Sequence, residues 1–158
     1  MKKGFAGILG TAIGLALGVL GSKYFSNKKI DEKEKKVNKF KDYYQLLNQW
    51  LTLKQEGQSL EKYFIDHGYR SIAIYGMGEL GNRLYNELKN SEIEVKYAID
   101  QYAGTTYSEI EIVELDGNLE EVDIIVVTSI FAYDEIKDQL EEKVMYPVVS
   151  LEDVVFEL

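Results

Sequence analysis

The chain lacks the residue types on which several kinds of active site depend. Its 158 residues contain no cysteine, so disulfides and thiolate metal sites are excluded. Histidine and proline occur once each, as His67 and Pro147, which leaves little material for imidazole catalysis or for a histidine-rich metal centre. The length allows one domain of ordinary size and an appendage.

Charge divides the chain into two parts of opposite sign. Residues 1–41 contain ten lysines against three acidic residues, whereas residues 42–158 contain eight basic and 24 acidic residues. Nucleic-acid binding requires a basic face that neutralises phosphates. We therefore expect no nucleic-acid partner for the acidic part.

An uncharged, glycine-rich segment runs from Gly4 to Gly21. As a helix it would be about 27 Å long, close to the hydrocarbon thickness of a bilayer, so we expect a single transmembrane span over residues 4–21. Eight lysines follow in residues 22–41, and positive charge favours the cytoplasmic side, which predicts a cytoplasmic C-terminal part. The alternative is a cleaved signal peptide, with a cleavage site at Val19-Leu20-Gly21.

The glycines of this segment fall on one helical face. Gly10, Gly14 and Gly18 repeat every fourth residue, a spacing that permits close packing of helices in lipid. Self-association, packing on a partner and a plain anchor without specific contacts all remain open.

Residues 27–56 have helical composition, without glycine or proline. Apolar residues at a 3-4 spacing suggest either a short coiled coil that continues the span, or a helix whose segment Phe40–Leu53 packs on the globular part; we favour the second. Gly57 is expected to end this helix, and Ser59 to cap a short helix, Leu60–His67, that Gly68 closes.

From Tyr69 onward, short apolar runs alternate with amphipathic stretches. Alternation of this kind predicts an α/β fold: a small, doubly wound, mostly parallel sheet of about five strands in the order 3-2-1-4-5. The expected strands are Ser71–Tyr75, Val95–Asp100, Glu111–Val113, Asp123–Thr128 and Val148–Ser150, and the expected helices are Glu79–Lys89, Phe131–Lys143 and Leu151–Phe156, with a turn or single helical turn at Gly117–Glu121.

A glycine motif lies between the first strand and its helix. Gly76, Gly78 and Gly81 match G-x-G-x-x-G, and Asp100 closes the next apolar run nineteen residues later. In this arrangement the glycines permit a tight turn, close approach of a pyrophosphate and close packing of the helix, while the acidic residue accepts hydrogen bonds from ribose hydroxyls. The candidate binding residues are Gly76, Met77, Gly78, Glu79, Leu80, Gly81, Asp100 and Thr128, with Ser129 beside Thr128 at the lip of the expected crevice.

The residues from Tyr69 to Leu158 resemble a minimal Rossmann-type nucleotide-binding domain. More narrowly, the glycine motif and the Tyr97-Ala-Ile-Asp100 strand resemble modules that accompany bacterial surface-polysaccharide and sugar-nucleotide enzymes. The resemblance implies a ligand that is NAD or a nucleotide-sugar. Against it, Glu79 at the helix N-terminus could itself satisfy the backbone N–H groups and repel a pyrophosphate, and the glycine turn would then serve packing alone.

No catalytic motif accompanies this site. Tyr133 and Lys137 have the spacing of the Tyr-x-x-x-Lys pair of short-chain dehydrogenases, but Tyr24 and Lys28 have it too, and we interpret the match as coincidence. No hard-cation loop or histidine pair is evident, so we expect neither a metal site nor independent catalysis.

These features predict three parts: a membrane anchor at residues 1–25, a helical stalk or docking helix at residues 26–56 and a nucleotide-binding domain at residues 57–158. The expected function is a nucleotide-binding module on the bacterial cytoplasmic membrane, accessory to envelope polysaccharide synthesis. The alternatives are a sugar-nucleotide oxidoreductase or epimerase subunit that needs a partner, and a membrane scaffold without a ligand. The expected partners are the membrane, a nucleotide, and either a second copy of the chain or an envelope enzyme.

Overall fold

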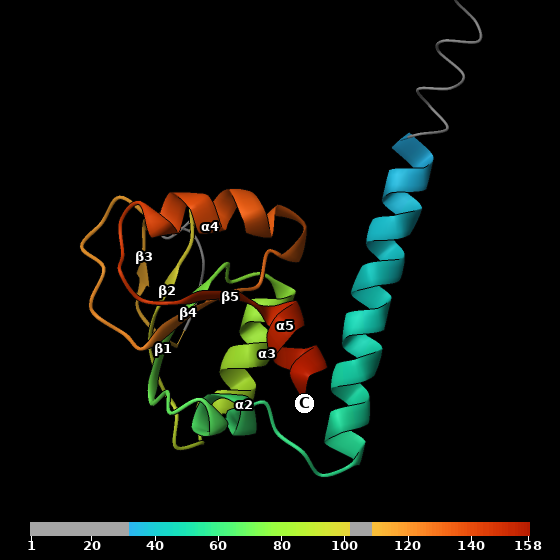
Figure 1. The fold of residues 1–158 in the computed structure, drawn as a ribbon, viewed down its shortest axis with the longest axis horizontal. Helices are drawn as coiled ribbons and strands as arrows, with labels where there is room; N and C mark the ends of the chain where they lie inside the picture. Colours follow the sequence, from blue (N-terminus) through green and yellow to red (C-terminus); the bar gives the residue numbers. More distant parts are fainter. Residues whose placement is uncertain (1–31, 102–108) are drawn as a thin grey trace, which may run out of the picture. The chain divides into compact units, whose positions relative to one another are not determined.

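The computed structural model describes residues 32–101 and 109–158 (Figure 1). The chain forms two compact units, Met1–Tyr44 and Gln45–Leu158. In the first unit, the described residues 32–44 are helical. The predicted span at residues 4–21 lies outside the described residues, and among those that are described no helix is both long and apolar enough to cross a bilayer.

The second unit begins with the rest of this helix, which ends at residue 55. Gly57 follows and ends the helix, as the sequence predicted, with a φ of +76° in the left-handed region. The short helix α2 (Glu61–Asp66) comes next and is closed by Gly68 at a φ of +78°. Leu60 is the N-cap residue of α2, while the Ser59 hydroxyl accepts a hydrogen bond from the Glu61 N–H at 3.3 Å.

A five-stranded parallel sheet forms the centre of the second unit. Its strand order, β3-β2-β1-β4-β5, confirms the predicted α/β topology. The interior strand β4 is buried along its whole length, which explains its uninterrupted run of isoleucine and valine. The strands are β1 (Ser71–Tyr75), β2 (Glu94–Ile99), β3 (Ile112–Val113), β4 (Ile124–Val127) and β5 (Val148–Ser150).

Helices cover both faces of this sheet. Figure 1 shows α4 (Tyr133–Glu141) on one face, and α3 (Glu79–Leu88) and α5 (Leu151–Glu157) on the other. Alternate strand residues point to α4, so that Ala73, Ile125 and Val127 join Ile136 and Leu140 in one apolar cluster.

One expected helix differs in detail, and the connection before β4 takes the first of its two expected forms, a turn. The segment expected as one helix from Phe131 begins as a 3₁₀ turn, η1 (Ile130–Ala132), before α4 starts at Tyr133. Between β3 and β4 the chain makes a turn, in which the Gly117 N–H donates to the Glu114 carbonyl at 2.9 Å. This turn lies just ahead of the expected range Gly117–Glu121, which forms no helix.

Glu87 on α3 ties the end of the long helix to the sheet unit. Its carboxylate, 5 % exposed, accepts hydrogen bonds from the Trp50 indole at 2.7 Å and the Leu60 N–H at 2.8 Å, pairs with Lys54 at 2.8 Å, and is reached by the Ser59 hydroxyl at 3.2 Å. Burial alone would raise the pKa of Glu87, but these donors outweigh it and lower the pKa below its ordinary range. The ionised carboxylate is therefore part of the folded structure.

We call the contacts of Glu87 with Trp50, Lys54, Ser59 and Leu60 the Glu87 clamp. The apolar residues around it confirm that the helix packs on the globular part. Leu46, Trp50 and Leu53 are at most 6 % exposed, whereas Phe40, which the sequence placed in the same docking segment, is 74 % exposed. Packing therefore involves the last three turns of the helix.

We expect Glu87→Gln to lower the free energy of unfolding by about 2–3 kcal/mol, because a buried carboxylate with several donors loses its charge. The pKa of Glu87 is lower in the folded state than in the unfolded state. The stabilisation is therefore complete above about pH 4.3, the unfolded-state pKa, and is lost as the pH falls through the folded-state pKa. Denaturant unfolding between pH 3 and 7 measures both effects. The control Glu92→Gln removes an exposed carboxylate and should cost less than about 0.5 kcal/mol; equal losses would contradict the clamp.

Candidate functional site

The glycine turn leaves β1 through a backbone conformation that requires glycine. Gly76 has a φ of +92°, and its N–H donates to the Ile99 carbonyl at 2.8 Å. A side chain at this φ would be strained, and a Cβ atom there would lie 2.9 Å from the Ser129 hydroxyl. The turn directs the chain from the carboxyl end of β1 into α3.

Gly81 allows α3 to lie directly against this turn. A Cβ atom on Gly81 would be 2.0 Å from the Gly76 carbonyl oxygen, closer than any real contact. Thr128, at the end of β4, holds the same oxygen, because its hydroxyl donates to the Gly76 carbonyl at 2.6 Å. Packing therefore accounts fully for Gly76 and Gly81.

Packing does not account for Gly78. Its φ of −71° is open to any residue, and a Cβ atom there would meet nothing within 4 Å. Gly78 is the N-cap of α3, a position at which serine, threonine, asparagine or aspartate would stabilise the helix better. The missing side chain leaves open space in front of the first turn of α3.

Asp100 lies beside the glycine turn, as the sequence predicted. Its N–H donates to the Val113 carbonyl at 3.0 Å, which fixes it at the carboxyl end of β2. Its Oδ2 accepts a hydrogen bond from the Met77 N–H at 2.8 Å. The carboxylate thus joins the end of β2 to the loop on the adjacent strand.

A cavity of about 320 Å³ opens where β1 and β4 end. This is the point at which the strand order reverses, and open α/β sheets bind ligands there. Burial raises the pKa of the Tyr75 phenol, and the carboxylates of Asp100 and Glu135 raise it further, so Tyr75 is neutral and the mouth is acidic. The lining residues are Tyr75, Gly76, Asp100, Gln101, Ser129, Ala132, Glu135, Ile136 and Gln139.

The other predicted binding residues take different places. Met77 and Leu80 are buried, so their backbones alone can face a ligand, whereas Glu79 is exposed in the first turn of α3. Thr128 is 6 % exposed and positions the turn, while its neighbour Ser129 lines the cavity.

Several residues of the site were not evident from the sequence. The Asn82 amide donates to the Met77 carbonyl at 2.8 Å and to the Gly78 carbonyl at 3.0 Å, which fastens the loop to α3. An asparagine four residues after the N-cap is the available signal for such a contact. Tertiary folding brings Gln101, Glu135 and Gln139 to the cavity. No local sequence motif predicts their presence there.

Tyr133 and Lys137 lie close together, and the Tyr133 hydroxyl is engaged with the backbone. The Tyr133 hydroxyl donates to the Val148 carbonyl at 3.0 Å, and the Lys137 ammonium lies 5.8 Å from the centre of the Tyr133 ring. Burial is the largest influence on Tyr133 and its pKa is raised, contrary to what proton transfer at neutral pH requires. His67 lies at the end of α2, where its ring contacts the Tyr63 carbonyl at 2.8 Å.

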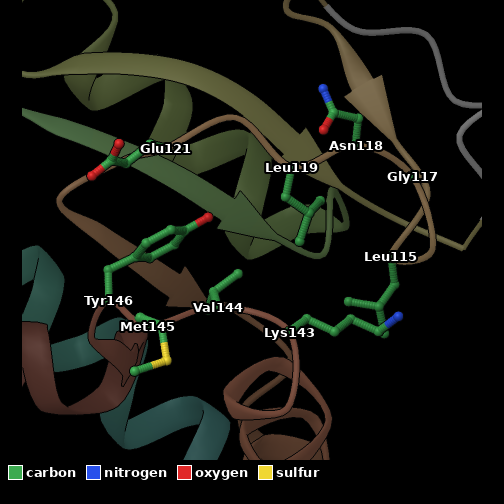
Figure 2. Close-up of a pocket in the computed structure, with 9 residues that line it drawn as sticks. All are labelled: Leu115, Gly117, Asn118, Leu119, Glu121, Lys143, Val144, Met145 and Tyr146. Carbon is green, nitrogen blue, oxygen red and sulfur yellow. The ribbon is translucent and has the colours of Figure 1, made fainter.

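A larger cavity, about 540 Å³, lies at the opposite edge of the sheet, ahead of β4 and β5. Figure 2 shows Tyr146 and Glu121 at one end of it, and Leu115 and Lys143 at the other. Lys143 is paired with Asp116 at 2.7 Å, and the cavity is remote from the strand ends at which α/β sheets bind ligands. Across the described residues, no cluster of three acidic or histidine side chains is arranged to hold a metal ion.

Alanine at Gly81 and alanine at Gly78 should change the free energy of unfolding by different amounts. Gly81→Ala forces its Cβ into the Gly76 carbonyl, so we expect a loss of about 3 kcal/mol in the free energy of unfolding. Gly78→Ala meets no atom and should cost about 0.5 kcal/mol. Denaturant unfolding measures both; equal losses would show that Gly78 too is required for packing.

Comparisons with known proteins identify a family for this fold and site. No match was found among curated proteins or among solved structures. Residues 68–149, just over half of the chain, match the N-terminal domain of the C2185-like proteins. The matched region contains all five strands except the last residue of β5, together with the glycine turn and Asp100. The chain therefore belongs to the C2185-like family.

Proposed function

We propose that this protein is a membrane-tethered, cytoplasmic module that binds a nucleotide, either NAD or a nucleotide-sugar, over its glycine turn. The observation that carries the proposal is Gly78, the one glycine of the motif that packing leaves unexplained. Its open position faces the first turn of α3, where backbone N–H groups and the helix dipole favour a pyrophosphate. The Glu79 side chain is exposed in this first turn of α3.

The polar groups of the 320 Å³ cavity suit a ribose or another sugar. Asp100 is at the place where an acidic residue accepts hydrogen bonds from ribose hydroxyls. Gln101, Ser129 and Gln139 add neutral donors and acceptors, and no arginine or lysine is among the described residues that line the cavity. This set favours hydroxyl groups and disfavours a 2′-phosphate, which supports NAD or a nucleotide-sugar over NADP.

Binding without independent catalysis is the activity these residues support best. Tyr133 has the lysine neighbour expected of a catalytic tyrosine. Its hydroxyl donates to a backbone carbonyl, and it is not among the residues that line the 320 Å³ cavity. An accessory role in envelope polysaccharide synthesis, as sensor or subunit, follows from the resemblance of the glycine motif and the Asp100 strand to modules of sugar-nucleotide enzymes. The composition of residues 4–21 and the lysines after them support the proposed tether to the bacterial cytoplasmic membrane.

Calorimetric titration of the full chain in detergent with NAD, NADH and UDP- and CDP-sugars tests ligand binding. We expect one of these ligands to bind and Gly78→Val to raise its dissociation constant more than tenfold, because the valine side chain fills the open space. The thermal stability of this variant should be almost unchanged.

The matched control is Asn118→Val, which places the same side chain on an exposed residue at the larger cavity, away from the glycine turn. It should leave the dissociation constant as it is. No binding of any of these ligands at millimolar concentration would refute the proposal, and so would full affinity in Gly78→Val.

Fractionation of cells that express the full chain tests the anchor. We expect the chain to remain in the membrane fraction after a carbonate wash, with its N-terminus intact by mass spectrometry, because residues 4–21 are apolar enough to span a bilayer. A mature chain that begins near Ser22 would contradict the anchor and support the cleaved signal peptide.

A further inference from the structure

The long helix carries an apolar stripe of five residues, of which four are exposed and one, Leu47, is half-buried. The stripe consists of Val37, Phe40, Tyr44, Leu47 and Leu51, whose 3-4 spacing places them along one side of a helix. In the first unit Val37 is 64 % exposed, Phe40 74 % and Tyr44 61 %; in the second unit Leu51 is 56 % exposed.

A different set of positions packs on the sheet unit. Leu46 and Trp50 fall between stripe residues in the sequence, and Leu53 follows the last of them; all three are almost fully buried. The indole of Trp50 is held by Glu87 at 2.7 Å, which fixes how the second unit's part of the helix is rotated. Because the buried residues already secure the helix, the exposed stripe needs another explanation.

The spacing of the stripe is that of a coiled-coil seam. Val37, Tyr44 and Leu51 repeat every seven residues and so occupy one core position, and Phe40 and Leu47 occupy the other. Lys33 and Lys54 take the next positions at either end. Because a lysine at a core position disfavours apolar packing, Lys33 and Lys54 limit the apolar stretch to just over two heptads.

We propose that this stripe pairs with the same stripe of a second copy of the chain as a short parallel coiled coil. A seam that repeats identical core positions is complementary to itself, which a two-fold symmetric contact requires. Leu47 and Leu51 also line an apolar groove of about 440 Å³ beside Trp50 and Arg83, into which the partner's helix can settle.

The parallel orientation rests on the proposed membrane anchor. The 31 residues that precede the described part join the helix at its N-terminal end, and they include Gly10, Gly14 and Gly18 at the spacing of close helix pairs in lipid. Two copies held by the same membrane present their helices in the same direction. The stripe and the glycine repeat then both favour a parallel pair of two copies of the chain.

Cysteine cross-linking of the full chain in membranes tests the pairing directly, because the native chain has no cysteine to interfere. A disulfide needs Cα atoms about 4.4–6.8 Å apart. We expect Val37→Cys to form a cross-linked dimer at least tenfold faster than the control Asn38→Cys, whose position is equally exposed but off the stripe. Equal rates would overturn the proposal.

A second pair of variants tests the seam and its direction. Adding Phe40→Glu to Val37→Cys should slow cross-linking at least tenfold, since a carboxylate enters the core of the seam. When chains with Val37→Cys and larger, tagged chains with Leu51→Cys are mixed, a parallel pair gives no mixed dimer, because the two positions are about 21 Å apart along the helix. A predominant mixed dimer would show an antiparallel pair and contradict the proposal.

These results are separable from the proposed function. Phe40→Glu should leave nucleotide affinity and membrane fractionation unchanged, because Phe40 belongs to the first unit, whereas the glycine turn belongs to the second. Equal cross-linking of Val37→Cys and Asn38→Cys in chains that remain in the membrane would refute the seam and retain the anchor. Rapid cross-linking of Val37→Cys in chains released from the membrane would support pairing and refute the anchor.

Discussion

The close approach of α3 to the end of β1 is the constraint on which the site depends. Gly81 touches the Gly76 carbonyl, the Thr128 hydroxyl donates to the same oxygen, and the Asp100 carboxylate accepts from the next N–H along the loop. Three strands therefore meet at one tight turn. Any side chain at Gly76 or Gly81 would separate the helix from the sheet and disperse the groups that line the cavity.

Within that arrangement, Gly78 is the residue that distinguishes the proposed binding site from a turn that serves packing alone. A turn that served packing alone would need glycine at its first and third positions and would gain stability from a better cap at the second. The first glycine of the motif, Gly76, lines a cavity with acidic and amide side chains, and these groups support the proposed binding of a sugar or ribose. Membership of the C2185-like family gives this domain relatives but assigns no ligand to it.

The sequence was most informative where local chemistry decides the structure. β1 and β5 begin and end at the predicted residues, and Gly57 and Gly68 end their helices, because apolar runs and left-handed glycines are local signals. Glu87 and Asn82 were not foreseen, since their partners are set by tertiary folding. Periodicity alone also could not divide the long helix into its buried face and its exposed stripe, because both faces are apolar.

Hydrogen–deuterium exchange of the full chain most directly tests whether the glycine turn holds a nucleotide. With NAD or a nucleotide-sugar bound, amides of the turn and the first helical turn, residues 76–82, should exchange more slowly, while those of residues 115–121 at the opposite edge of the sheet remain unchanged. Unaltered exchange of residues 76–82 at millimolar NAD, NADH, UDP-sugars and CDP-sugars would contradict nucleotide binding and leave the motif with packing alone.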